Sequence, residues 1–183
     1  MHAPTEDARA VELLRELGAA ELEHPGGTLL AHLERVRAKL VQWEARPALQ
    51  LAGLCHAFYG TDGFATALHP VERRSELAAV IGNEAESLVY FYASCDREAS
   101  YPTLAEDDAV FHDRFTGETF TPSLSRRREF AELTVANELD IARINAEFRA
   151  KRGPDLLALF TGFRPLLSEQ AWGECRTVLS HRG

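Results

Sequence analysis

The chain has 183 residues, with 20 lysines and arginines against 28 aspartates and glutamates, so its formal net charge is −8. This length predicts one domain, large enough to bury a core without disulfides. With 45% hydrophobic and 26% charged residues, the composition is that of a soluble globular chain and favours neither the disordered nor the membrane class. Because an acidic chain lacks the surplus of cations that phosphate contacts require, we expect no nucleic-acid partner.

The cysteines and the start of the chain bear on its compartment. Cys55, Cys95 and Cys175 lie far apart in segments predicted to be helical, and an odd number of dispersed cysteines favours a reducing environment. Residues 1–7 have neither the basic nor the apolar region of a secretory leader, and no apolar run is long enough to cross a bilayer. We therefore expect a soluble, cytoplasmic protein with no membrane partner.

The helical spacing of apolar residues predicts five helices in the first half of the chain. Thr5 and Thr28 are N-cap candidates, while Pro47 and Pro70 suit the first turns of later helices. The predicted helices cover about residues 5–18, 28–43, 48–59, 70–81 and 85–95. The third is apolar nearly all round, so we expect it in the middle of the fold.

The pattern is less regular after residue 96. A short acidic helix is predicted around residues 104–111, and a Thr-Gly pair between aromatic residues predicts a small hairpin over residues 114–121. Further helices are predicted over residues 123–151, 155–162 and 167–180. The fold class is therefore all-α, a bundle of about eight helices with one small β-hairpin.

Polar residues interrupt the apolar faces of three predicted helices. They are His32, His56, and the pair Asn137 and Asp140, which lie one turn apart. A buried polar group is costly unless it is hydrogen-bonded or bound to something. Taken singly, each histidine is more often a satisfied core residue than a ligand. Together, two histidines on successive helices and an acid or amide on a later helix form the donor set of an all-helical metal site.

Four sequence motifs resemble the HD metal-dependent hydrolase superfamily, in its alarmone (ppGpp) hydrolase branch. Its His-x-x-x-Val helix is matched by His32-Leu-Glu-Arg-Val36, and its apolar helix ending in His-Asp by Ala52-Gly-Leu-Cys-His56. Two later helices of the branch are matched by Ile81-Gly-Asn-Glu-Ala-Glu-Ser-Leu-Val89 and by Val135-Ala-Asn-Glu-Leu-Asp140. The resemblance covers residues 24–145. It implies one HD-like helical domain over residues 1–183, with residues 150–183 as a C-terminal helical extension.

The resemblance also implies a metal site, with departures. Its ligands would be His32 and His56 with Asn137 or Asp140, but Ala57 stands where the family has the aspartate after the second histidine. Asn137 replaces the last family aspartate, and a neutral amide is a weaker ligand than a carboxylate. The reduced set favours one divalent ion, Fe, Mn or Zn, over a dinuclear pair.

Other candidate residues surround this predicted site. We expect catalytic roles for His24, Tyr59, Thr61 and Asp62, and substrate binding by Gly26, Gly27 and Arg73. Backbone amides before a helix suit an anionic group, and an arginine suits phosphate or carboxylate. The structural alternatives are ordinary turns at the glycines and at Asp62, and a solvated ion pair of Arg73 with a nearby glutamate.

Three functions remain open at this point. The first is a metal-dependent hydrolase acting on a small phosphorylated or otherwise anionic molecule. The second is a non-haem iron oxygenase of HD-like fold, and the third a catalytically degenerate domain that binds a ligand or partner. The aromatic residues Phe160, Phe163 and Trp172 suit either the edge of the core or a homodimer face.

Overall fold

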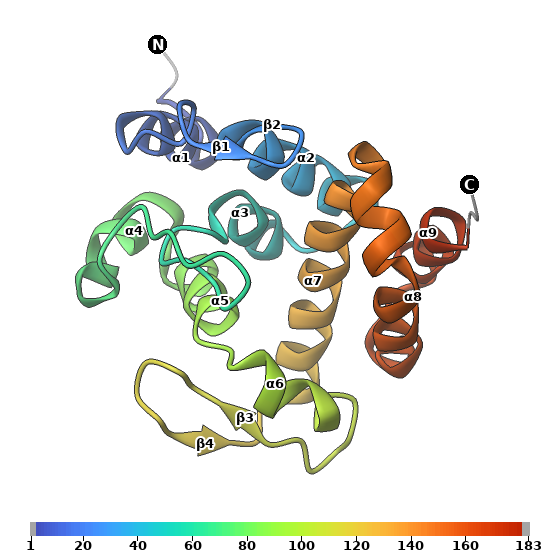
Figure 1. Ribbon diagram of the computed structural model, residues 1–183. Coiled ribbons are helices and arrows are strands. Elements are labelled where there is room, and N and C mark those ends of the chain that lie inside the picture. The colour runs from blue at the N-terminus through green and yellow to red at the C-terminus, as the bar shows by residue number, and fades with distance from the viewer. Residues whose placement is uncertain (1–2, 181–183) are drawn as a thin grey trace. The chain divides into compact units, whose positions relative to one another are not determined.

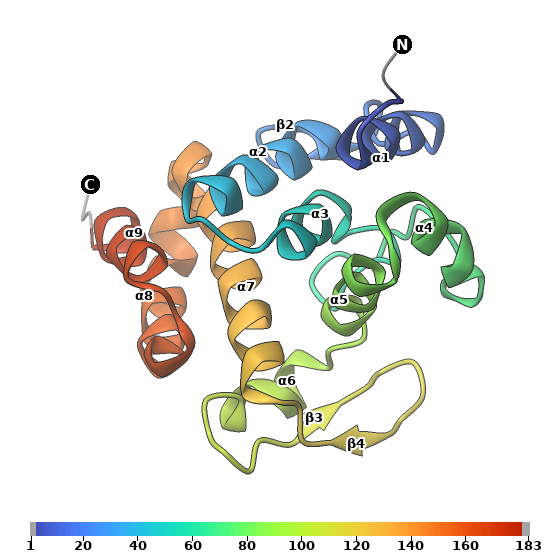
Figure 2. The same cartoon turned by 180° about the vertical axis from the view of Figure 1, so that it is seen from behind.

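The computed structural model describes residues 3–180. Residues 1, 2 and 181–183 lie outside the described part, and the first two belong to the segment 1–7 that was predicted not to be a secretory leader. Within the described residues there are nine α-helices and two short antiparallel pairs of strands, which confirms the all-α class (Figures 1 and 2). The chain divides into two compact units, residues 1–95 and 96–183. A single domain over the whole chain stays a prediction. Among the described helices, none has the length and apolar character needed to cross a membrane.

The first unit contains five helices and one pair of strands. These are α1 (Glu6–Glu16), β1 (Glu23–His24), β2 (Gly27–Thr28), α2 (Leu29–Gln42), α3 (Pro47–Cys55), α4 (Arg74–Ile81) and α5 (Asn83–Ala93). A short 3₁₀ helix, Val71–Arg73, leads into α4. The predicted caps are confirmed, because the hydroxyls of Thr5 and Thr28 accept hydrogen bonds from Ala8 N and Ala31 N, each at 3.2 Å.

Helix α3 lies in the middle of the first unit, as its apolar sequence predicts. It packs against α2 on one side and α5 on another, and α1 also contacts it. Six of its nine residues are buried: Leu49, Leu51, Ala52, Gly53, Leu54 and Cys55. This central position places the end of α3 within reach of side chains from several neighbouring elements.

The turn before α2 is a hairpin, where the sequence predicted only a turn. Glu23 pairs with Thr28 and His24 with Gly27. Gly26 and Gly27 have φ values of 86° and 141°, which a side chain would oppose. The hairpin therefore fixes His24 beside the first turn of α2.

The second unit contains four helices and the other pair of strands. These are α6 (Arg97–Ser100), β3 (Phe111–His112), β4 (Thr119–Phe120), α7 (Leu124–Ile144), α8 (Ala146–Gly162) and α9 (Glu169–Leu179). Helices α8 and α9 both pack against α7 (Figures 1 and 2). The small hairpin is confirmed, but its first strand, β3, precedes the predicted range of residues 114–121, and only β4 lies within it. The last predicted helix is confirmed in α9.

The helix predicted over residues 104–111 is wrong. The helical turns come earlier, in α6 and in a 3₁₀ helix, Tyr101–Thr103. Side chains hold the backbone that follows, because Arg127 donates to the Leu104 carbonyl at 3.1 Å and Val110 N donates to the Thr103 hydroxyl at 3.0 Å. Such bonds compete with helical backbone pairing.

The single helix predicted over residues 123–151 is also wrong, since it is divided at Asn145. The Asn145 backbone is extended, with φ −125° and ψ 99°, and its side chain accepts a hydrogen bond from Phe148 N at 2.9 Å. Asn145 thus ends α7 and caps α8. Helix α8 includes the separately predicted segment 155–162, with Pro154 inside it.

Candidate functional site

Three histidines gather in the first unit. His24 comes from β1, His32 from the first turns of α2, and His56 directly follows α3 as its C-cap. The rings of His24 and His32 stack with centroids 4.1 Å apart, and His56 meets His32 edge to face at 5.4 Å. His32 and His56 are buried, with 1% and 3% of their surfaces exposed, while His24 is half-buried. We call these three residues the histidine cluster.

One hydrogen bond orients the imidazole of His56. Its Nδ1 lies 2.8 Å from the carbonyl oxygen of Gly53. A carbonyl can only accept, so Nδ1 carries the proton and Nε2 carries the lone pair in the neutral ring. The same arrangement fixes the tautomer of many histidines that ligate metals through Nε2.

A close approach of two helices brings His32 and His56 together. A Cβ atom added at Gly53 would lie 2.5 Å from Leu40 Cδ1, so the absence of a side chain lets α3 pack tightly on α2. Gly53 therefore contributes twice, through this approach and through its carbonyl. Its position in the sequence, three residues before His56, gave no separate signal of either role.

Two aromatic residues, which the sequence analysis did not single out, border the histidine cluster. Tyr92 of α5 meets His56 edge to face at 5.5 Å, and Phe64 meets His24 at 5.7 Å. Tyr92 belongs to an apolar run, which by itself indicates only a core helix. A shallow cleft of about 420 Å³ opens beside His24, bordered by Glu23, Pro25 and Gly27.

The donors present fit part of a metal site. Imidazole nitrogens such as those of His32 and His56 suit Zn, Fe or Mn. Ala57, buried where the resemblance places a carboxylate, offers no donor. Within residues 3–180, no group of three or more His, Cys, Asp or Glu side chains is arranged to hold a metal ion. The other predicted ligands, Asn137 and Asp140, are buried on α7 of the second unit, and their role stays a prediction.

Tyr59 takes part in a network with the buried Glu86 and the partly exposed Arg74. Its hydroxyl donates to Glu86 Oε1 at 2.8 Å, and Arg74 contacts both oxygens of the same carboxylate at 2.6 and 2.9 Å. Burial, followed by the hydrogen bond to Glu86, raises the pKa of Tyr59 far above its usual value. Tyr59 is therefore a hydrogen-bond donor at neutral pH. The sequence gave no sign of Glu86, whose charge is buried in an apolar helix.

The remaining predicted site residues lie in turns or on the surface. The Thr61 hydroxyl accepts a hydrogen bond from Phe64 N at 3.0 Å inside a tight turn, and Asp62 is exposed at that turn. Arg73 Nε donates to Glu76 at 2.7 Å, which is the solvated ion pair named above as the alternative to substrate binding.

Cys55 directly precedes His56 in the chain. Burial raises the pKa of its thiol to about 12, so Cys55 is not a thiolate nucleophile at neutral pH.

Comparison with known proteins gives one similarity. Residues 13–97 match the model of a family described as Domain of unknown function (DUF6817). The matched segment covers less than half of the chain and includes all three residues of the histidine cluster. No curated protein and no solved structure matches the chain.

Proposed function

We propose that this protein is a metal-dependent hydrolase of HD-like fold that acts on a small phosphorylated or otherwise anionic molecule. The observation that carries the proposal is the pair His32 and His56, buried side by side on successive helices. The bond from His56 to the Gly53 carbonyl supports it, because that bond leaves the Nε2 lone pair as the donor. A buried imidazole is costly unless it is hydrogen-bonded or bound to something, and a shared metal ion would be a common partner for His32 and His56.

In this proposal His32 and His56 hold one divalent ion of Fe, Mn or Zn. When bound, the ion would supply Lewis acidity toward a phosphate ester or similar bond. Because the buried Ala57 offers no donor where the HD superfamily has an aspartate, the smaller donor set favours a single ion over a pair. His32 and His56 thus act as the anchors of the site.

His24 and the hairpin turn would handle the substrate. His24 stacks on His32 and borders the cleft of about 420 Å³, where its imidazole can hold or release a proton. The backbone amides of Gly26 and Gly27 lie next to His24, in a turn just before α2. Amides before a helix favour an anionic group, so this cleft suits a phosphate or carboxylate.

A second candidate function is a catalytically degenerate domain that binds a small ligand or a partner. Two features favour it: buried Ala57 stands where the HD superfamily that the sequence resembles has a carboxylate, and the described residues contain no group of three or more side chains arranged to hold a metal ion. In that case the histidine cluster would contribute to stability and to binding, and not to hydrolysis.

Metal analysis separates the two candidates. The protein is purified without chelator or affinity metal, and bound metal is measured by mass spectrometry for the wild type, His32→Ala, His56→Ala and His112→Ala. His112 lies in β3 of the second unit and serves as the matched control. We expect about one ion per chain in the wild type and in His112→Ala, and its loss in the two cluster variants.

The outcomes then decide the function. Bound zinc or manganese, with hydrolysis of p-nitrophenyl phosphate that is lost in His56→Ala, supports the hydrolase. Bound iron with oxygen uptake would point to an oxygenase. A wild type that binds no metal after reconstitution contradicts the proposal and favours the degenerate domain.

A further inference from the structure

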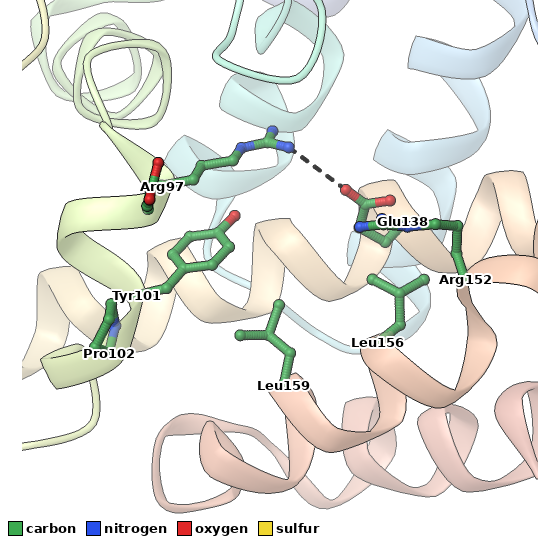
Figure 3. A pocket seen from close by; sticks show the side chains of 8 residues that line it. Arg97, Tyr101, Pro102, Glu138, Arg152, Leu156 and Leu159 are labelled. Atoms are coloured by element: carbon green, nitrogen blue, oxygen red, sulfur yellow. Dashed lines mark ion pairs between the residues drawn. The ribbon is translucent and has the colours of Figure 1, made fainter.

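The second unit contains a cleft of about 450 Å³, independent of the histidine cluster. Its walls come from α6 and the following 3₁₀ helix, from α7 and from α8 (Figure 3). This volume falls within the range of pockets that hold small molecules. We call it the α6–α8 cleft.

One side of the α6–α8 cleft is apolar and held in place. Leu156 and Leu159 of α8 lie opposite the ring of Tyr101 (Figure 3). The Tyr101 ring itself is braced edge to face by Phe163 at 5.4 Å and by Phe130 at 6.1 Å. A braced aromatic wall facing two leucines can enclose a flat or short apolar group with little loss of side-chain entropy.

The other side carries charge. Arg97 points toward Glu138, with its Nη1 3.6 Å from Glu138 Oε1 (Figure 3). These two charges are largely buried and offset one another. Arg152 of α8 also lines the cleft and is exposed, and it forms no ion pair with any residue from 3 to 180. Glu98 of α6 also lines the cleft and is exposed. Beside the apolar wall the cleft therefore offers one cation on α8, Arg152, and one carboxylate on α6.

We propose that the α6–α8 cleft binds a small amphipathic organic anion. Its apolar body would pack between Tyr101 and the two leucines, and its carboxylate or sulfonate-like group would contact Arg152. A planar guanidinium pairs with such a group through two parallel hydrogen bonds, which a neutral ligand cannot accept with the same strength. The inference does not depend on the proposed function, since it involves other residues in the other unit.

Fluorescence titration of the full chain with 8-anilinonaphthalene-1-sulfonate tests this proposal. Its neutral analogue, N-phenyl-1-naphthylamine, reports the contribution of the anionic group. We expect saturable binding of the sulfonate at one site, weakened about tenfold or more in Arg152→Glu. Lys151→Glu is the matched control, because Lys151 is an exposed neighbour that does not line the cleft. It should bind like the wild type.

A second pair of variants tests the apolar wall. Leu159→Trp should fill the cleft and weaken binding of both probes, whereas Leu157→Trp, on the same helix but outside the lining, should not. Circular dichroism of each variant shows whether it is folded. Absence of saturable binding, or equal losses in Arg152→Glu and Lys151→Glu, would overturn the proposal.

Discussion

Glu132 links α7 to the start of α9 through a buried carboxylate. Its Oε1 accepts a hydrogen bond from Ser168 N at 2.6 Å, and its Oε2 accepts one from the Ser168 hydroxyl at 3.0 Å. Ser168 in turn caps α9, accepting from Ala171 N at 3.1 Å. Burial raises the pKa of Glu132, and the bonds from Ser168 only partly oppose that rise.

The raised pKa predicts how stability depends on pH. The native state favours the protonated Glu132, so its contribution to stability is complete below the ordinary value of 4.5 and is lost as pH rises through the raised native pKa. We expect Glu132→Gln to reduce the decrease in the free energy of unfolding that occurs as pH rises above 4.5. Urea unfolding at a series of pH values measures the slope. Glu118→Gln, at an exposed position in the same unit, should keep the wild-type slope, and equal slopes in wild type and Glu132→Gln would contradict the prediction.

At the scale of elements, the packing of α2 on α3 depends on Gly53. A methyl group there would meet Cδ1 of Leu40, whose side chain is fully buried. We expect Gly53→Ala to lower the free energy of unfolding by about 1–3 kcal/mol, the usual cost of overpacking. The cost should be smaller in a Leu40→Ala background, where the obstructing atom is gone.

Urea unfolding of the four proteins of this double-mutant cycle measures the coupling. Gly173→Ala provides the control, since a Cβ on that helical glycine of α9 meets nothing within 4 Å. It should be neutral or slightly stabilising. An equal cost of Gly53→Ala in both backgrounds would show that Leu40 is not the obstacle.

The boundary between α7 and α8 shows what local patterns omit. The apolar spacing continues through Asn145, so periodicity alone predicts one helix. Asn145 is nevertheless a good N-cap residue, and its side chain bonds to Phe148 N at 2.9 Å. At the other end of α7 the helix was predicted to begin at residue 123, and Ser123 caps it by accepting from Arg126 N at 3.3 Å. The difference is that Ser123 follows an irregular segment, whereas Asn145 interrupts a regular one.

At the scale of the whole molecule, all three cysteines are buried and no disulfide joins any two of them. Burial raises the pKa of the Cys55 and Cys175 thiols to about 12, so both are protonated at neutral pH. We expect native protein to react with Ellman's reagent far more slowly than urea-unfolded protein, in which three thiols per chain should react.

A reporter variant controls for the reagent. Ala67 is exposed in the loop before α4, so Ala67→Cys should add one thiol that reacts at once in the native state. Rapid reaction of a thiol in the native wild type would contradict the burial of all three cysteines in the structure.

Much of this protein follows from its sequence alone. The positions of the five helices in the first unit, the caps at Thr5 and Thr28 and the central place of α3 depend on neighbouring residues and on periodicity, so local patterns predict them. The sequence also singled out His32 and His56, because a polar residue on an apolar helix face is visible without coordinates. Their proximity within the first unit is confirmed, and their role as ligands stays a prediction.

Only the tertiary structure decided the surroundings of these residues. Two sets of contacts join residues that lie far apart in the chain. The ring of Tyr92 packs against His56, and Tyr59 and Arg74 both donate hydrogen bonds to the buried Glu86. No local pattern encodes such contacts, because each side chain alone has an ordinary role in a core or on a surface. The close approach at Gly53 likewise depends on where Leu40 lies on another helix. Burial and partners are properties of the packed molecule, and they decide which polar residues bear charge and which only donate hydrogen bonds.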